Sequence, residues 1–135
     1  ISVHARLNEN NQNMIGNREI EMMKPTSYLI NTARAGLIKE EALLTALKNE
    51  SIAGAALDVF WEEPLPEESP WQELDNVTLT SHIAGTTTEA LNKSPRLLVE
   101  DINRLLHKDK EPKFLVNPEV LKREEVQEWL QENQS

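Results

Sequence analysis

Cysteine is absent from this sequence, and so is any long run of apolar residues. Without cysteine the chain has no disulfides and no thiolate metal sites, which fits a reducing compartment. No apolar segment approaches the roughly 18 to 20 residues that a membrane helix needs, and no basic segment followed by an apolar one opens the chain. The sequence therefore predicts a cytoplasmic protein with no membrane partner.

Positive charge is also scarce. The 135 residues include 14 lysines and arginines against 23 aspartates and glutamates, which gives a net charge of -9. Such an excess of negative charge opposes non-specific binding to nucleic acid. We therefore expect no nucleic-acid partner. The length and the 39% apolar content fit one globular domain.

Glycine is the third shortage, with only four residues and no Gly-x-Gly-x-x-Gly pattern. That pattern lets the backbone approach the pyrophosphate of a dinucleotide. The two glycines that follow apolar runs, Gly36 and Gly54, therefore do not form a phosphate-binding signature.

Short apolar runs alternate with helical patterns along the chain. Strands are expected at residues 1–4, 27–31, 52–59 and 77–80, the second of them covered on both faces. Helices are expected at residues 17–24 and 39–49. A long helix should begin with Ser94 as N-cap and Pro95 at its first position. Its buried stripe would be Leu98, Val99, Ile102, Leu105 and Leu106, and a tail helix would bury Val126, Trp129 and Leu130.

This order of elements predicts an α/β fold, a mostly parallel sheet with helices packed on it. Right-handed crossovers would align the strands. The expected organisation is one sheet-containing domain over residues 1–110, followed by a carboxyl-terminal tail with a short helix over residues 111–135. A loop with three prolines, residues 64–70, would be extended.

Reactive side chains follow each of the four expected strands. His4 comes after the first strand, Arg34 after the second, Asp58 and Glu63 after the third, and His82 after the fourth. Open parallel sheets bind ligands beyond the carboxyl ends of their strands, where loops and helix amino termini gather. These five side chains are therefore candidates for a binding or catalytic site.

Each candidate also has an ordinary structural explanation. Arg34 fits an exposed loop arginine, and Glu63 fits a solvated surface charge. Asp58 could cap a turn as readily as hold a ligand. His82 could be a buried histidine with satisfied hydrogen bonds, and His4 has no carboxylate beside it in the sequence. The pattern alone leaves both explanations open.

Three segments carry a resemblance to a known family. They read Asn-Thr-Ala-Arg-Ala-Gly-Leu-Ile-Lys-Glu-Glu-Ala-Leu at 31–43, Gly-Ala-Ala-Leu-Asp-Val-Phe-Trp-Glu-Glu-Pro-Leu-Pro at 54–66 and Leu-Thr-Ser-His-Ile-Ala-Gly-Thr-Thr at 79–87. In order and spacing they resemble the motifs of the D-isomer-specific 2-hydroxyacid dehydrogenases, such as phosphoglycerate dehydrogenases and hydroxypyruvate reductases. The resemblance covers about residues 1–121. It implies the carboxyl-terminal half of a Rossmann-type NAD-binding domain.

The resemblance also implies roles for individual residues. Arg34 matches the arginine that holds the substrate carboxylate and polarises the keto oxygen, which suits a guanidinium fork. His82 matches the acid/base that protonates the developing alkoxide as NADH delivers hydride. Glu63 matches the carboxylate that orients this imidazole and favours its charged form. The positions that would line the cofactor pocket are His4, Thr32, Ala33, Arg34, Asp58, His82 and Gly85, with Asp58 at the nicotinamide carboxamide.

The expected reaction is hydride transfer between NAD(H) and a small D-2-hydroxy acid or 2-keto acid, by a homodimer. The family's glycine-rich loop, its ribose-binding acidic residue and its substrate domain would all precede Ile1. The 135-residue chain alone is therefore expected to be inactive. The same preceding segment chooses the substrate and distinguishes NAD from NADP, so both choices remain open.

Two positions depart from the family pattern. Ser81 stands where the family commonly has proline, and the freer backbone should loosen His82 slightly. Ala35 stands where glycine is frequent. Two alternatives to an enzyme also stay open: a binding or oligomerisation module that pairs through an exposed sheet edge, and a non-catalytic dinucleotide-binding relative of the family.

Overall fold

A computed structural model describes residues 1–107 and 112–133 of the chain. The chain forms two compact units, Ile1–Gly85 and Thr86–Ser135. The sheet and all the candidate site residues belong to the first unit. Across the described ranges, no helix has both the length and the apolar character that crossing a membrane requires.

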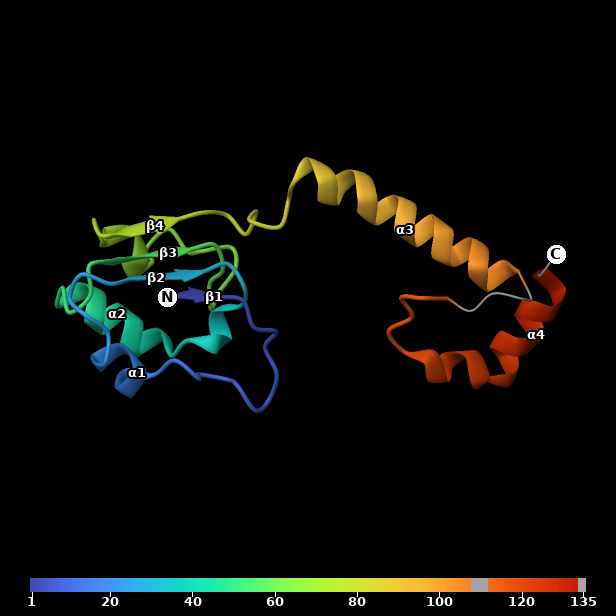
Figure 1. The fold of residues 1–135 in the computed structure, drawn as a ribbon, viewed down its shortest axis with the longest axis horizontal. Coiled ribbons are helices and arrows are strands. Elements are labelled where there is room, and N and C mark those ends of the chain that lie inside the picture. The colour runs from blue at the N-terminus through green and yellow to red at the C-terminus, as the bar shows by residue number, and fades with distance from the viewer. Residues whose placement is uncertain (108–111, 134–135) are drawn as a thin grey trace. The chain divides into compact units, whose positions relative to one another are not determined.

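The first unit is built on a four-stranded parallel sheet with strand order β1-β2-β3-β4 (Figure 1). The strands are β1 (Ser2–Val3), β2 (Tyr28–Asn31), β3 (Gly54–Leu57) and β4 (Val77–Leu79). Their last residues are paired in register: Val3 with Asn31, Asn31 with Leu57, and Leu57 with Leu79. The carboxyl ends of all four strands therefore meet in one row. The predicted α/β fold is confirmed.

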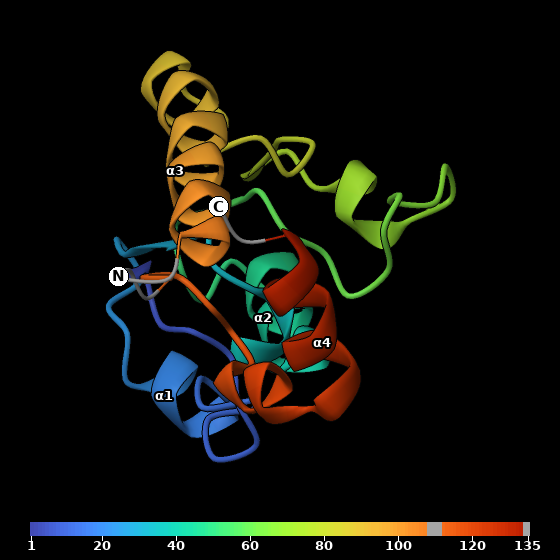
Figure 2. The same cartoon turned by 90° about the vertical axis from the view of Figure 1, so that its right-hand side faces the viewer.

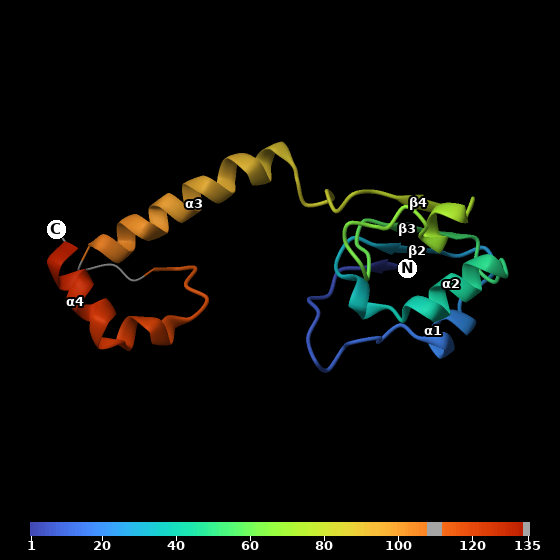
Figure 3. The same cartoon turned by 180° about the vertical axis from the view of Figure 1, so that it is seen from behind.

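Two helices cover one face of this sheet. They are α1 (Asn17–Glu21) and α2 (Glu40–Lys48), and both lie under the sheet in the front and back views (Figures 1 and 3). The apolar stripe predicted for α2 is buried as expected. Its members are Ala42, Leu43, Ala46 and Leu47, which pack with Leu29, Ile52 and Leu57 in the core.

The opposite face of β2 is not covered within this unit. Tyr28 is 61% exposed and Ile30 is 40% exposed, whereas their neighbours Leu29 and Asn31 are fully buried. Successive strand residues point to opposite faces, and α1 and α2 lie on only one of them. The expectation that residues 27–31 are covered on both faces is therefore wrong for the described structure.

The loop between β3 and β4 is anchored by two tryptophans. The rings of Trp61 and Trp71 are stacked, with centroids 5.4 Å apart and planes 9° from parallel. The Trp61 indole N–H donates to the Ile38 carbonyl, and the Trp71 indole N–H donates to Glu40 at the start of α2. Trp71 lies in a short 3-10 helix, Pro70–Glu73, so the proline-rich loop ends in a helical turn. These contacts fix the loop that carries Glu63.

The second unit contains α3 (Thr88–Leu106), a 3-10 helix (Pro118–Lys122) and α4 (Glu124–Asn133), with the 3-10 helix leading directly into α4 (Figure 2). The predicted start of α3 at Ser94 and Pro95 is wrong. The N-cap is Thr87, whose hydroxyl accepts a hydrogen bond from the Ala90 N–H, and Pro95 lies inside the helix. The helix starts at the upstream cap. It tolerates the loss of one backbone hydrogen bond, because proline has no N–H to donate.

Most of the apolar stripe predicted for α3 is exposed, and its last two members, Leu105 and Leu106, are half-buried. Leu98, Val99 and Ile102 are 63%, 56% and 46% exposed, and α3 has no buried residue among those described. In α4, Leu130 is buried as predicted, but Trp129 is half exposed. The spacing of these residues predicted the helices correctly. It could not establish what would cover them.

Candidate active site

The paired strand ends bring the predicted site residues to one rim of the sheet. His4, Thr32, Asp58 and Thr80 each come directly after the last residue of their strand, and those last residues are neighbours in the sheet. The loops that carry Arg34, Glu63 and His82 start from this same rim. A parallel sheet in this register thus gathers side chains from four separate parts of the sequence.

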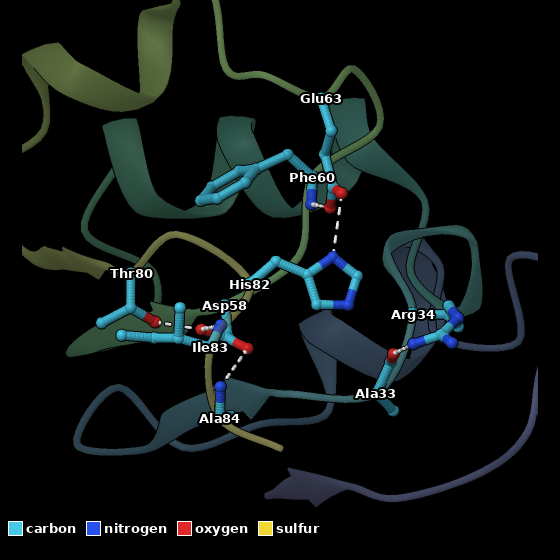
Figure 4. Close-up of polar contacts among 9 residues, drawn as sticks. All are labelled: Ala33, Arg34, Asp58, Phe60, Glu63, Thr80, His82, Ile83 and Ala84. Atoms are coloured by element: carbon cyan, nitrogen blue, oxygen red, sulfur yellow. Dashed lines mark hydrogen bonds and ion pairs between the residues drawn. The ribbon is translucent and has the colours of Figure 1, made fainter. Parts of the chain in front are cut away.

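Glu63 and His82 form the central contact of this rim (Figure 4). The Oε2 atom of Glu63 lies 2.8 Å from the Nδ1 atom of His82. The other carboxylate oxygen, Oε1, accepts a hydrogen bond of 2.9 Å from the backbone N–H of Phe60. Because both oxygens are engaged, the carboxylate has one defined orientation toward the imidazole.

The electrostatic surroundings keep Glu63 ionised. The hydrogen bond from His82 is the largest influence lowering the pKa of the Glu63 carboxyl, and the Phe60 N–H is the next. The positive charges of His82 and Arg34 lower this pKa further. An ionised carboxylate can only accept hydrogen bonds, so the Nδ1 atom of His82 must carry the proton of the pair.

This arrangement decides the chemistry of the remaining imidazole nitrogen. With the proton on Nδ1, the Nε2 atom of a neutral His82 presents a lone pair, and the Nε2 atom of a charged His82 presents an N–H donor. In Figure 4 one ring nitrogen faces Glu63, and the other ring nitrogen faces away from Glu63, on the side of the view where Arg34 is drawn. The geometry therefore allows proton transfer at Nε2, on that side.

Arg34 lies in the loop after β2, as the residue preceding the 3-10 helix Ala35–Leu37. Its side chain is exposed, and one guanidinium nitrogen, Nη1, donates to the Ala33 carbonyl at 2.7 Å. Buried Asn31 holds the loop, since its side-chain N–H donates to the Arg34 carbonyl and its side-chain oxygen accepts from the Ala33 N–H. The guanidinium keeps further donors that these contacts do not use.

Asp58 differs from the other candidates because it is buried, at 2% exposure. Its carboxylate accepts hydrogen bonds from the Thr80 hydroxyl and from the backbone N–H groups of Ile83 and Ala84. Burial raises the pKa of this carboxyl, but these hydrogen bonds and the nearby His82 outweigh burial, so the pKa lies below its ordinary value. Asp58 is thus an ionised group inside the protein with three donors.

The other predicted positions lie at the edges of this arrangement. His4 is exposed. Its Nε2 atom is 2.8 Å from the Ser2 hydroxyl, so this contact does not involve Glu63 or His82. Thr32 is exposed and Ala33 half-buried in the loop before Arg34. A Cβ built on Gly85 would meet nothing within 4 Å. The structure therefore shows no local packing reason for glycine at position 85.

A cavity of about 730 Å³ opens beside the Glu63 and His82 pair. Its walls are largely apolar and include Phe60, Leu65 and Leu79. Across residues 1–107 and 112–133 no group of three or more histidine, aspartate or glutamate side chains is placed to hold a metal ion.

Sequence reasoning missed the groups that hold the candidate side chains in place. Asn31 and Thr80 were both predicted only as the last residues of strands. The other missed groups are backbone N–H donors: that of Phe60, which binds Glu63, and those of Ile83 and Ala84, which bind Asp58. A signal for Thr80 does exist, because the in-register pairing of Leu57 with Leu79 puts Asp58 and Thr80 side by side.

Residues 1–84 match the family model described as "D-isomer specific 2-hydroxyacid dehydrogenase, NAD binding domain". The chain belongs to this family. A glyoxylate reductase of Thermofilum pendens is 45% identical to this dehydrogenase-family chain over 122 residues, 90% of the chain and 36% of the relative. An (S)-sulfolactate dehydrogenase of Chromohalobacter salexigens is 39% identical over 106 residues, 78% of the chain and 34% of the relative.

Solved structures of 2-hydroxyacid dehydrogenases share the fold. D-lactate dehydrogenase from Lactobacillus jensenii, solved with NAD+, has a TM-score of 0.75 at 28% identity, over 85% of this chain and 38% of that one. A D-isomer-specific 2-hydroxyacid dehydrogenase from Xanthobacter autotrophicus Py2, in complex with NADPH and MES, has a TM-score of 0.72 at 32% identity, over 84% of this chain and 45% of that one. The chain is part of a Rossmann-type NAD-binding domain of this family. It spans about a third of the length of the curated relatives it matches.

Proposed function

We propose that this chain supplies the acid/base pair and the carboxylate-binding arginine of an enzyme that transfers hydride between NAD(H) and a small D-2-hydroxy acid or 2-keto acid. One observation carries the proposal: the 2.8 Å contact between Glu63 and the Nδ1 atom of His82, at the sheet rim that also holds the Arg34 loop. Membership of the dehydrogenase family supports it.

His82 moves the proton in this proposal. In the direction of keto-acid reduction, its Nε2–H donates the proton to the oxygen that becomes the hydroxyl; in the reverse direction, Nε2 removes that proton. Glu63 holds Nδ1 and stabilises the positive charge that the imidazole carries before it donates. General acid/base catalysis of this kind accelerates reactions by roughly 10²- to 10⁴-fold.

Arg34 binds the substrate in this proposal. A guanidinium has five N–H donors in a planar fork and can bind a carboxylate through two parallel hydrogen bonds. Only one nitrogen of Arg34, Nη1, is bound to a neighbouring carbonyl in the structure. The remaining donors can hold the substrate carboxylate and place the keto carbon beside the Nε2 atom of His82.

The residues at the rim fit the nicotinamide end of the cofactor. Bound NAD(H) supplies or accepts the hydride. The open space around Gly85 and the exposed Thr32 hydroxyl at the rim support positions for these residues along that end, together with His4 and Ala33. Asp58 keeps one acceptor position on its Oδ2 atom, where the carboxamide N–H could bind. The sequence has no Gly-x-Gly-x-x-Gly pattern, so the proposal assigns no residue to the pyrophosphate.

A hybrid enzyme tests the proposal. In the glyoxylate reductase of Thermofilum pendens, the segment that aligns with this chain would be replaced by this chain, since the two are 45% identical over 122 residues. We expect NADH oxidation at 340 nm with glyoxylate, and its loss in the hybrid that carries His82→Gln. The 135-residue chain alone should show no turnover.

The other outcomes have defined meanings. A folded hybrid that binds NADH but does not turn over would contradict the proposal and favour a non-catalytic dinucleotide-binding module. Turnover that survives His82→Gln would contradict the role of the pair. The substrate range and the choice between NADH and NADPH follow from testing several 2-keto acids with both cofactors.

A homodimer and a cytoplasmic location belong to the same proposal. The edge strand β1 leaves backbone groups unpaired within the described sheet, and such an edge favours association. The lack of cysteine fits a reducing compartment. Light scattering on the purified protein checks the first part, where a monomer mass contradicts it. Cell fractionation checks the second part.

A further inference from the structure

His82 has an unusual backbone conformation. Its φ angle is 56°, in the left-handed region, which few residues other than glycine adopt. In that conformation the side chain meets Glu63 across the loop. Something in the surrounding structure has to hold this conformation, because the loop 81–85 is exposed and packing does not fix it.

One buried carboxylate fastens the chain on both sides of His82. The Oδ1 atom of Asp58 accepts from the Thr80 hydroxyl at 2.5 Å and from the Ile83 N–H at 2.9 Å. The Oδ2 atom accepts from the Ala84 N–H at 2.9 Å. The three donors lie two residues before His82 and one and two residues after it. Figure 4 shows Thr80, Ile83 and Ala84 grouped around this carboxylate, while the imidazole of His82 is joined to Glu63.

Asp58 can do this because it is itself fixed in the sheet. Its backbone N–H donates to the Asn31 carbonyl, and its side chain is 2% exposed. On the other side of the contact, the Thr80 N–H donates to the Leu57 carbonyl, so the loop starts from a fixed point. Hydrogen bonds to an ionised acceptor are roughly twice as strong as neutral ones.

The lone pairs of Asp58 are mostly used by these contacts. The Oδ1 atom has two donors and the Oδ2 atom has one, so a single acceptor position is left for a ligand. A role limited to binding a nicotinamide carboxamide would leave three donors of the His82 loop unexplained. The contacts therefore point to a role inside the protein in addition to the one remaining acceptor position.

We propose that Asp58 and Thr80 are positioning residues that hold the 80–84 loop so that His82 meets Glu63. The catalytic meaning of this assignment rests on the proposed function, but the positioning itself does not. The Asp58 carboxylate and its hydrogen bonds from Thr80, Ile83 and Ala84 are called the clamp below.

NMR on the 135-residue chain, without cofactor or substrate, tests the clamp. The chain has three histidines, so the ring nitrogens of His82 can be assigned. In Asp58→Asn, the amide NH₂ cannot accept from the Ala84 N–H, and exchange of that N–H should rise by roughly 10- to 100-fold. The pKa of Glu63 should move up toward its ordinary value of 4.5, and the His82 Nδ1 signal should lose its hydrogen-bonded shift.

Matched variants make the test specific. Thr80→Val removes the hydroxyl and should shift the Glu63 pKa and the His82 signal in the same direction, whereas Thr80→Ser keeps the hydroxyl and should restore both. Asp101→Asn makes the same exchange at another carboxylate that accepts two backbone N–H groups, those of Lys113 and Phe114. It should leave the Glu63 and His82 signals unchanged.

The proposal is overturned if Asp58→Asn leaves the Ala84 exchange and the Glu63 pKa unchanged, or if Asp101→Asn changes them equally. If Asp58→Asn fails to fold, the Thr80 pair decides: equal spectra for valine and serine overturn the proposal. None of these signals depends on hydride transfer. A hybrid enzyme without activity would therefore contradict the proposed function and leave the clamp standing.

Discussion

The Nδ1 atom of His82 lies 2.8 Å from the Oε2 atom of Glu63, although the two residues are 19 positions apart in the sequence. They follow β3 and β4, whose last residues Leu57 and Leu79 are paired in register. A one-residue slip in this pairing would exchange the two faces of a strand and separate the side chains. The contact is therefore a consequence of the sheet, and it leaves Nε2 as the nitrogen available for proton transfer.

Replacing His82 by glutamine should abolish most of the turnover of the hybrid enzyme. An amide cannot exchange a proton near neutrality, so kcat should fall by roughly 10²- to 10⁴-fold, while the dissociation constant for NADH stays within about twofold. Stopped-flow absorbance at 340 nm and NADH fluorescence measure the two quantities. His107→Gln, at the end of α3, is the control and should be active. Near-normal turnover in His82→Gln would remove the assignment.

The contact between Glu63 and His82 should persist in acid below the ordinary pKa of a glutamate. The folded protein lowers the Glu63 pKa from 4.5, chiefly through the hydrogen bond from His82. The stabilisation is therefore fully present above pH 4.5 and is lost as the pH falls through the lowered value. Carbon-13 NMR of the Glu63 carboxyl should show this titration in wild type and a higher midpoint in His82→Gln. A wild-type midpoint at 4.5 would contradict the pairing.

The sequence predicted the parallel sheet because its strands are short apolar runs with helical patterns between them. It also predicted that reactive residues follow strands that end at one rim, although His4 contacts Ser2 there and not the other candidates. It could not predict the clamp at Asp58, because two of the three donors are backbone N–H groups, which every residue except proline has.

The errors in the second unit have a different cause. The spacing of Leu98, Val99 and Ile102 indicates one apolar face, and the residues do lie on a helix, but they are exposed within the described structure. Periodicity reports which face a helix can bury and does not report what buries it. Pro95 misled in a similar way, because proline at a first helical position and proline inside a helix look alike until the cap at Thr87 is known.

Replacing Arg34 by lysine should weaken substrate binding while preserving the positive charge. A lysine ammonium cannot form the two parallel hydrogen bonds of a guanidinium. Losing one such bond to a carboxylate costs roughly 1.5 to 3 kcal/mol, so kcat/KM for glyoxylate in the hybrid should fall about 10- to 100-fold. Steady-state kinetics against Arg18→Lys in α1, which should behave as wild type, isolate the effect. Equal kinetics in both variants would argue against carboxylate binding by Arg34.

Two glycine substitutions should separate stability from cofactor binding. An alanine Cβ at Gly54 would lie 2.5 Å from the Asn76 carbonyl oxygen, whereas a Cβ at Gly85 meets nothing within 4 Å, and neither glycine has a positive φ. Gly54→Ala should therefore lower the free energy of unfolding of the chain by about 1 to 3 kcal/mol. Gly85→Ala should change it by less than about 0.5 kcal/mol. Urea denaturation followed by tryptophan fluorescence measures both.

Cofactor binding should be affected by Gly85→Ala, the substitution that leaves stability almost unchanged. If Gly85 lines the nicotinamide pocket, the methyl group of Gly85→Ala occupies space that the cofactor needs, and KM for NADH in the hybrid should rise although the protein is as stable as wild type. This combination cannot arise from unfolding, because the stability measurement on the same variant excludes it. An unchanged KM for NADH in Gly85→Ala would remove position 85 from the proposed pocket and leave His82, Glu63 and Arg34 unaffected.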